Sequence, residues 1–347
     1  ISDINALKEL TTLQILDLTG TPLSEVAPLE ALTNLQTLKL SGTRINDIRP
    51  LETLLALRKI TLAFTKIDSV KALARLTKVE ALDLNGTPLT DASPLTTLTA
   101  LRTLELAFTP VNDAEPLKTL TALRTLDLYG TEINDASSIA TLTALQTLDL
   151  VETQVSDLSP LATLIALQKL ALAYTQVENV APLGALTSLQ SLDLTGTQVS
   201  DITALRPLKK LSTLGLSFCM LRETPDWILR HPMMEDLDLQ GNPLTDIPAE
   251  VYSHRNCLPH LRAHFADIPK QQGVADRSVK LIVLGNGRVG KSSIVDQLLE
   301  RPYDAEKAST HGIRLEFFEF PIHTTNNSTT SLRIWDFGGQ DIYHGTH

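Results

Sequence analysis

The residues best suited to chemistry lie at positions 285–292, where the sequence reads Gly-Asn-Gly-Arg-Val-Gly-Lys-Ser. This spacing matches the G-x-x-x-x-G-K-[ST] pattern of a phosphate-binding loop. Glycines let the backbone turn tightly and present successive N–H groups to an anion. We predict that Lys291 reaches the β- and γ-phosphates of a nucleotide and that Ser292 ligates Mg²⁺. The predicted nucleotide-binding residues are Gly285, Asn286, Gly287, Arg288, Val289, Gly290, Lys291, Ser292, Ser293 and, further along the chain, Gly339.

A second set of polar residues follows a strand predicted at 332–335. Asp336 can hold Mg²⁺ through water, and Gln340 is placed to orient an attacking water molecule. The N–H of Gly339 can approach a γ-phosphate because glycine has no side chain. Thr310 can offer its hydroxyl to Mg²⁺ when a γ-phosphate is present and swing away otherwise. The candidate catalytic residues are Lys291, Thr310 and Gln340, and the candidate metal ligands are Ser292, Thr310 and Asp336.

Each motif has a simpler alternative. The glycine pattern could match by chance, and Thr310 could belong to an ordinary exposed turn. A strand predicted at 279–284 and a helix predicted at 293–299 give the loop its required context, with the phosphates at the positive N-terminus of the helix. The separation of Lys291 and Asp336 by 45 positions leaves room for one helix, a loop and a β-hairpin. The order of the motifs therefore favours nucleotide binding.

Three stretches together resemble the Roc domain, the Ras-like GTPase of Roco proteins. They are G-N-G-R-V-G-K-S at 285–292, T-H-G-I at 310–313 and D-F-G-G-Q-D-I-Y-H at 336–344. The resemblance implies that the ligands are GTP and GDP with Mg²⁺, and that GTP is hydrolysed to GDP and phosphate in a signalling switch. It also implies a homodimer formed through a COR region outside this sequence. The guanine-reading motifs N-K-x-D and S-A-K do not occur before His347, so we expect the sequence to end within the Roc domain.

Two other functional classes remain open from the sequence. One is a signalling ATPase with leucine-rich repeats, as in immune receptors, although those usually place the repeats after the nucleotide domain. The Gly-Gly-Gln that follows Asp336 and Phe337 fits a GTPase better. The other is an interaction scaffold with an inactive nucleotide site. The intact Gly290-Lys291-Ser292 argues against lost binding but not against lost hydrolysis.

A repeat of 22 residues occupies the first 250 positions. Its L-x-L pairs begin at Leu16, Leu38, Ile60, Leu82, Leu104, Leu126, Leu148, Leu170, Leu192, Leu214 and, after a step of 23 residues, Leu237. Each unit reads L-x-x-L-x-L-x-x-T-x-[LIV], and its period is typical of leucine-rich repeats. The pattern predicts short strands whose leucines face inward. One unit cannot bury its apolar face alone, so the units should stack into a single parallel sheet.

Two other repeat positions predict how the chain leaves each strand. Many such repeats place Asn just after the strand to bond the backbone, and a hydroxyl can do similar work. Here this ladder position holds Thr21, Thr43, Thr65, Thr87, Thr109, Thr131, Thr153, Thr175, Thr197, Cys219 and Asn242. Prolines at one phase, such as Pro28 and Pro50, favour 3₁₀ turns or extended backbone on the outer side. The repeats are similar to those of internalin-like proteins, with Thr replacing Asn.

These features predict a leucine-rich-repeat solenoid, an α/β horseshoe, followed by part of a P-loop α/β GTPase (Roc) domain. We expect residues 1–265 to form the solenoid with its C-terminal cap. Residues 266–278 would be a linker, and residues 279–347 the N-terminal half of the Roc domain. A helical turn is predicted at 227–229, and residues 258–265 should close the open end of the core, because terminal repeats must shield it.

The inner face of the solenoid should show one residue between each pair of strand leucines. That column reads Asp17, Lys39, Thr61, Asp83, Glu105, Asp127, Asp149, Ala171, Asp193, Gly215 and Asp238. Residues 1–250 hold 30 Asp and Glu against 19 Lys and Arg, which argues against nucleic acid as a partner. The column could bind a basic protein or a basic surface of the same protein, or it could be merely solvated. Phe64, Phe108, Tyr174 and Phe218, just before the ladder, could anchor a partner or pack along the solenoid edge.

Composition predicts the cellular setting. Cys219 and Cys257 are too few for a disulfide framework, which favours a reducing compartment. Cys219 should be a buried structural thiol. No apolar run is long enough to span a bilayer, and no secretory signal is visible, although the sequence begins in mid-pattern. We therefore expect a cytoplasmic protein without a transmembrane segment.

Overall fold

A computed structural model describes residues 3–267, 279–283, 291–299, 301–302, 312–321 and 329–338. The chain forms two compact units, Ile1–Ile268 and Pro269–His347. Among the helices in these ranges, none has the length and apolar composition needed to cross a membrane.

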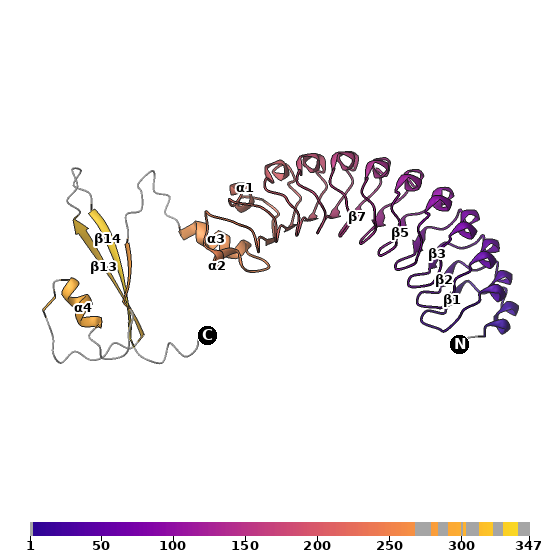
Figure 1. Ribbon diagram of the computed structural model, residues 1–347, viewed down its shortest axis with the longest axis horizontal. Coiled ribbons are helices and arrows are strands. Elements are labelled where there is room, and N and C mark those ends of the chain that lie inside the picture. Colours follow the sequence, from indigo (N-terminus) through magenta and orange to yellow (C-terminus); the bar gives the residue numbers. More distant parts are fainter. Residues whose placement is uncertain are drawn as a thin grey trace. The chain divides into compact units, whose positions relative to one another are not determined.

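The first unit is a leucine-rich-repeat solenoid built on an 11-stranded parallel sheet (Figure 1). The sheet follows chain order, and Leu16 at the centre of the first strand pairs with Leu38 at the centre of the second. Identical spacing of 22 residues makes this register possible, so the predicted stacking of repeats is confirmed. The strands are β1 Ile15–Asp17, β2 Thr37–Lys39, β3 Lys59–Thr61, β4 Ala81–Asp83, β5 Thr103–Glu105, β6 Thr125–Asp127, β7 Thr147–Asp149, β8 Lys169–Ala171, β9 Ser191–Asp193, β10 Thr213–Gly215 and β11 Asp236–Asp238.

Short 3₁₀ helices form the outer side of the arc, as predicted from the prolines that recur at one position of the repeat (Figure 1). Proline occupies the first turn of several of these helices. Its lack of an N–H costs nothing there, because N–H groups in the first turn have no intrahelical acceptor. An Asp just upstream accepts the backbone N–H that opens the helix, as Asp135 does from Ser137 at 2.8 Å. The helices are η1 Asn5–Glu9, η2 Ala27–Ala31, η3 Arg49–Thr53, η4 Lys71–Arg75, η5 Ser93–Thr97, η6 Glu115–Thr119, η7 Ser137–Thr141, η8 Ser159–Thr163, η9 Ala181–Ala185 and η10 Thr203–Leu205.

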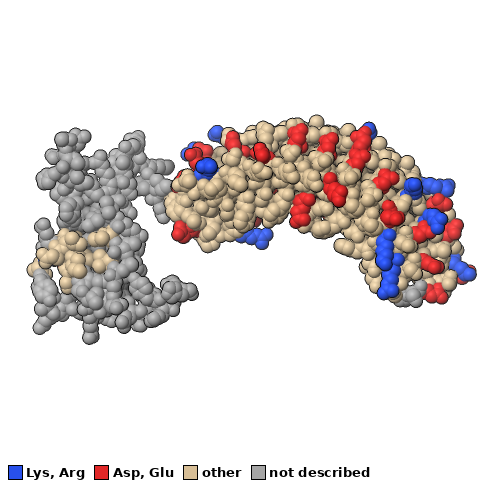
Figure 2. All heavy atoms as spheres, in the orientation of Figure 1, with Lys and Arg blue, Asp and Glu red and all other residues tan. Residues whose placement is uncertain are grey.

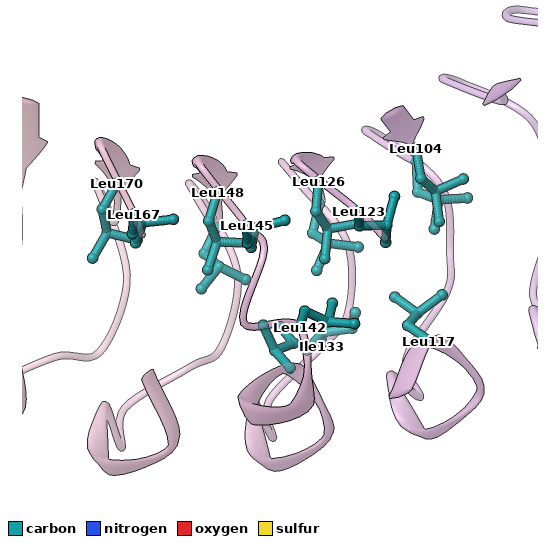
Figure 3. Close-up of a cluster of buried hydrophobic side chains, with 14 of the residues drawn as sticks. Leu104, Leu117, Leu123, Leu126, Ile133, Leu142, Leu145, Leu148, Leu167 and Leu170 are labelled. Atoms are coloured by element: carbon teal, nitrogen blue, oxygen red, sulfur yellow. The ribbon is translucent and has the colours of Figure 1, made fainter. Parts of the chain in front are cut away.

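Rows of leucine fill the space between the sheet and the 3₁₀ helices. Figure 3 shows Leu104, Leu126, Leu148 and Leu170 at equivalent places in four successive repeats. These side chains are at most 2% exposed. The core is therefore continuous along the solenoid, as stacking of one-sided units requires.

The ladder residues fasten each strand to the turn that follows it. Each ladder threonine donates its hydroxyl to the backbone carbonyl three residues before it; for Thr131 and Leu128 the distance is 2.7 Å. Asn242 instead bridges two repeats, donating to Leu216 and Leu239 and accepting from Leu221 N–H. Threonine thus hydrogen-bonds a backbone carbonyl of its own repeat, whereas asparagine also hydrogen-bonds the backbone of the preceding repeat. The predicted hydrogen-bonding role of the ladder is confirmed.

Cys219 and Cys257 behave as structural thiols. Cys219 is buried in the ladder and donates to the Leu194 carbonyl at 3.2 Å. Burial raises the pKa of Cys219 and raises the pKa of Cys257 to about 11. Both thiols therefore stay protonated near neutral pH, and the prediction of a buried structural Cys219 is confirmed.

Three short α-helices end the first unit. They are α1 Asp226–Leu229, α2 Ala249–Tyr252 and α3 Leu258–Asp267. Helix α1 is the predicted helical turn, and its Ile228 is fully buried. Helix α3 contacts β11, and its Leu258 and Leu261 are at most 1% exposed. The end of the leucine core is thus closed where the sequence predicted a cap.

The described part of the second unit is a three-stranded sheet with one helix. Its elements are β12 Val279–Val283, α4 Lys291–Leu298, β13 Gly312–Pro321 and β14 Thr329–Gly338. Strand β14 lies between the others, parallel to β12 and antiparallel to β13. The predicted hairpin is confirmed. Helix α4 begins two residues before the predicted 293–299 helix, and β14 extends the predicted 332–335 strand in both directions, so it includes Asp336.

We expect Thr131→Val to lower the free energy of unfolding by about 1 kcal/mol. The substitution removes a buried hydroxyl and its hydrogen bond to the Leu128 carbonyl but keeps the shape of the side chain. Thr131→Ser keeps the hydroxyl and should lose less of the stability. Urea unfolding followed by circular dichroism measures both. Equal stability of Thr131→Val and the parent protein would show that the ladder hydroxyl contributes nothing.

Candidate functional site

Two of the nucleotide motifs are linked in sequence to neighbouring strand ends of the three-stranded sheet. Val283, the last residue of β12, pairs with Asp336 in the parallel β14. Residues 284–290 follow Val283 directly in the chain, and α4 begins at Lys291. The phosphate-loop sequence therefore follows the carboxyl end of β12, and this end lies beside Asp336. Ligands bind beyond the carboxyl ends of strands in open α/β sheets.

The antiparallel pairing of β13 with β14 places Gly312, which belongs to the third motif, at the same end of the sheet. Gly312, the first residue of β13, pairs with Gly338, the last residue of β14. Because the two strands are antiparallel, the chain enters β13 where it leaves β14. Thr310 lies two positions before Gly312 in the sequence, and Gly339 and Gln340 follow Gly338. Strand register alone thus connects three separate stretches of sequence to one end of the sheet.

Some predicted site residues lie within the described ranges. Lys291, Ser292 and Ser293 are the first three residues of α4, and Asp336 lies in β14. The others lie outside the described residues: Gly285, Asn286, Gly287, Arg288, Val289, Gly290, Thr310, Gly339 and Gln340. The fold therefore brings Asp336 to the sheet edge from which the phosphate-loop sequence continues.

Helix α4 is held to the sheet by its apolar face. Val295 is fully buried, whereas Ile294 is 58% exposed, and the helix contacts β14. Helix α4 has eight residues and begins with Lys291 and Ser292 at its N-terminus, where backbone N–H groups lack intrahelical partners. A helix N-terminus that follows a glycine-rich loop is suited to bind phosphate.

A second candidate surface is the inner face of the solenoid. We define the acidic row as Asp83, Glu105, Asp127 and Asp149, one residue from each of β4–β7 at the same register. These four strands carry no Lys or Arg, and none of the four carboxylates forms an ion pair within the described residues. Figure 2 shows Asp and Glu recurring along the solenoid, with many of the Lys and Arg toward its N-terminal end.

Burial and crowding destabilise the charge of three members of the acidic row. Partial burial raises the pKa of Asp83, Glu105 and Asp149, and neighbouring carboxylates add to each rise. Asp17, in the same column, differs because it accepts hydrogen bonds from Thr19 and from Lys39, whose Nζ lies 3.0 Å away. Hydrogen bonds from Thr19 and Lys39 lower the pKa of Asp17 to about 2. Lys59 in β3 favours the charged forms of Asp83 and Glu105, but the four carboxylates leave an excess of negative charge along β4–β7.

Exposed aromatic side chains run alongside the acidic row. We define the aromatic row as Phe64, Phe108, Tyr174 and Phe218, which are 66%, 53%, 58% and 60% exposed. Each ring contacts the glycine at the equivalent position of the next repeat, and a Cβ at Gly86 would lie 2.5 Å from the Phe64 ring. The rings thus pack along the solenoid edge, the second of the two predicted alternatives, and still present more than half of their surface to solvent.

Tyr129 and Glu152 extend the aromatic row. The Phe108 and Tyr129 rings meet edge to face with centroids 4.5 Å apart. The Tyr129 hydroxyl donates to Glu152 at 3.1 Å, and this bond raises the pKa of Tyr129. Sequence reasoning missed Glu152, which shares the slot and the backbone conformation of the aromatic row. Glu152 could have been found from the sequence, because it follows Phe108 by the same 44 residues that separate Phe108 from Phe64.

The acidic row does not form a metal centre. Across the described ranges, no group of three or more His, Cys, Asp and Glu has the geometry to hold a metal ion. The carboxylates instead lie along a line, one per strand, with adjacent strands about 4.8 Å apart.

Comparisons with known proteins match both units. A family model described as Ras of Complex, Roc, domain of DAPkinase matches residues 280–347, and one described as a leucine-rich repeat region matches residues 88–239. A Roc-COR-CHAT protease of Runella zeae is 33% identical over 123 residues, which are 32% of this chain. This chain spans 13% of that protein's length. The Ras-related protein Rab-18 of Lymnaea stagnalis is 34% identical over 66 residues, 19% of this chain and 31% of that protein.

The solenoid is similar to solved leucine-rich-repeat structures. The crystal structure of internalin InlF from Listeria monocytogenes has a TM-score of 0.62 and 29% identity, and the match covers 74% of this chain and 82% of that one. This likeness supports the predicted similarity to internalin-like repeats.

Asp149→Asn should raise the free energy of unfolding at pH 7 by about 0.5 kcal/mol, the scale of a cross-strand pair. Asn keeps an oxygen for the Val151 N–H, which Asp149 now accepts at 2.9 Å, but carries no charge beside Asp127. A carboxyl whose pKa is raised by folding favours the folded state at low pH and loses that contribution as pH rises. The gain should therefore vanish in acid.

Asp135→Asn is the matched control on the outer side. Hydrogen bonds from Ser137 lower the pKa of Asp135, so its charge favours the folded state at neutral pH. Thermal unfolding of both variants across pH separates the two cases. Stabilisation of both variants to the same extent would mean that total charge, and not the acidic row, sets the effect.

Proposed function

Because the chain belongs to the Roco family, in which a leucine-rich-repeat region precedes a Ras-like Roc domain, we propose that it binds GTP and hydrolyses it to GDP and phosphate as a molecular switch. The observation that supports this most is strand register. Val283 pairs with Asp336, and Gly312 pairs with Gly338, so described residues within or next to the three motifs lie at the same end of the sheet.

Each candidate residue has a role in nucleotide binding. Lys291 would neutralise charge on the β- and γ-phosphates, and the N–H groups of Gly285–Gly290 would donate to phosphate oxygens. The N–H groups of Ser292 and Ser293 would add donors at the start of α4. Gly339 would donate its N–H to the γ-phosphate, which requires the close approach that glycine permits.

The residues also fit a magnesium ion. The hydroxyls of Ser292 and Thr310 and the carboxylate of Asp336 are oxygen ligands, which Mg²⁺ prefers, and two of the three belong to elements that meet at the sheet edge. When bound, Mg²⁺ supplies positive charge that offsets the charge of the phosphates. Thr310 would engage only in the triphosphate state, which would make its segment the switch.

Hydrolysis would depend on positioning more than on covalent chemistry by the protein. Gln340 would orient a water molecule for attack on the γ-phosphorus, and Lys291 with the loop amides would stabilise the charge that develops on the phosphate oxygens. The bond from the γ-phosphorus to the bridging oxygen breaks, and GDP leaves with that oxygen. Unassisted hydrolysis of this type is slow, so an arginine supplied by another chain could accelerate it.

The solenoid would act as the interaction module that responds to the nucleotide. Its inner face offers an extended surface of the kind that solenoids use to bind proteins. Partner proteins or other domains of the same protein are the proposed ligands, and homodimerisation and a cytoplasmic location remain predictions from sequence. A signalling ATPase and a scaffold with an inactive nucleotide site are the alternatives, and the measurements below distinguish them.

We expect Lys291→Ala to weaken binding of fluorescent GTP and GDP to the full-length protein by about 100-fold, the scale of a lost charge-assisted hydrogen bond. Fluorescence anisotropy in the presence of Mg²⁺ measures the affinity. Lys66→Ala removes the same charge from an exposed site in the other unit and should leave binding unchanged. Tight binding of ATP would instead favour the ATPase class, and unchanged GTP affinity in Lys291→Ala would contradict the site.

Gln340→Ala should lower the rate of phosphate release from GTP by about 100-fold, the scale of a misplaced reacting group, while nucleotide affinity stays within about twofold. Single-turnover assays on the full-length protein measure the rate. A parent protein that binds GTP but releases no phosphate would support the scaffold class. An unchanged rate in Gln340→Ala would assign water positioning to another residue.

A further inference from the structure

The aromatic row keeps a backbone conformation that favours glycine. Phe64, Phe108, Tyr174 and Phe218 have φ between +55° and +57°, and other repeats place Gly in the same slot. A bulky residue in this left-handed region is strained relative to glycine. Such strain persists where surrounding structure holds it, and it clusters at functional sites.

Packing within the solenoid leaves most of the aromatic surface unused. Each ring contacts the glycine of the next repeat, and the Phe108 ring also meets the Tyr129 ring edge to face, but the four residues remain more than half exposed. Burying such a ring in a partner would be favourable, because exposed aromatic surface contributes strongly at interfaces. The solenoid therefore exposes the rings of the aromatic row, which we call aromatic platforms, although their backbones are strained.

The aromatic row contains two pairs with the same internal spacing, and three repeats separate Phe108 from Tyr174. Phe108 follows Phe64 by two repeats, and Phe218 follows Tyr174 by two repeats. Two strand separations amount to about 9.6 Å. A polyproline II chain presents every third residue on one side, at intervals of about 9.3 Å. Aromatic-lined surfaces are a common way to bind such chains, because the ligand is extended before it binds.

The acidic row defines the charge of the ligand. Glu105 and Phe108 are three residues apart in one repeat, so their backbones lie at most about 10 Å apart. A ligand chain that crosses the strands can therefore touch both rows. The carboxylates have no ion-pair partner within the described residues, and the rings can also take a cation over their faces.

We propose that the inner face of the repeats between β3 and β10 binds an extended, polyproline-II-like segment of a partner protein that is rich in Lys or Arg. Its cationic side chains lie on the acidic row, and the same segment crosses the aromatic row. This inference rests on the proposed role of the solenoid as an interaction module. The proposed surface is distinct from the nucleotide site, because no residue of either row belongs to the nucleotide motifs.

The test uses the full chain and labelled peptides. The probe is a fluorescein-labelled peptide of repeated Pro-Pro-Arg triplets, and repeated Pro-Pro-Glu triplets are the charge-reversed control. Fluorescence anisotropy should show binding of the arginine peptide and none of the glutamate peptide. Tighter binding of an Arg-Ala peptide that forms a helix would overturn the extended ligand, and binding of neither basic peptide would overturn the proposal.

Two variants test the two rows. Phe108→Gly removes one platform and relieves its backbone strain, so the variant should unfold at the same temperature as the parent or a higher one. Its affinity for the arginine peptide should fall about fivefold, the scale of one lost cation–π contact. Asp127→Asn should weaken binding about fivefold through the lost charge. Unchanged affinity in either variant would remove that row from the binding surface.

Matched controls separate a defined surface from general charge attraction. Asp135→Asn removes one negative charge from the outer side, and Ile165→Thr removes a 62% exposed apolar side chain outside both rows. Both should leave affinity for the arginine peptide unchanged. Equal losses in Asp135→Asn and Asp127→Asn would show non-specific attraction and overturn the proposal. Peptide binding should persist in Lys291→Ala, so failure of the nucleotide site and failure of this surface give different results.

Discussion

Strand register is the constraint on which both units depend. In the solenoid, each central leucine lies beside its counterpart in the next repeat, as Leu126 lies beside Leu148. A shift by one residue would turn the leucines toward solvent and expose the core. In the second unit, register places Val283 beside Asp336, so the strand that precedes the phosphate-loop sequence lies next to the strand that carries a proposed Mg²⁺ ligand. One structural rule thus organises a packed core in one unit and the strands of the proposed nucleotide site in the other.

Because the repeats stack in register, a residue type that recurs at one repeat position forms a row of side chains along the solenoid. Threonine after each strand becomes a line of hydroxyls bonded to backbone carbonyls, and Asp or Glu within the strand becomes a line of partly buried carboxylates. The first row stabilises the fold, whereas the second opposes it through burial and repulsion. Residues that reduce stability on a surface are often retained for function. The acidic row and the strained aromatic row both have this character, and Glu105 and Phe108 lie only three residues apart in one repeat.

Much of the fold could be predicted because the repeat is strict. The 22-residue period fixed the strands, the proline phase indicated 3₁₀ helices, and the ladder hydroxyls had a clear backbone role. The positive φ of Phe64 could not be predicted, since aromatic residues rarely adopt it and a pattern of letters carries no dihedral angle. In the second unit, motif order predicted the hairpin, but the extension of β14 through Asp336 required the pairing with β13.

The central claim is that three stretches around 284–292, 303–312 and 336–340 form one guanine-nucleotide site. Amide hydrogen exchange of the full-length protein with Mg²⁺, in the presence of GTP or ATP, tests it directly. The account predicts that GTP slows exchange in all three stretches together and that ATP does not. Protection confined to one stretch, or equal protection by ATP, would contradict it.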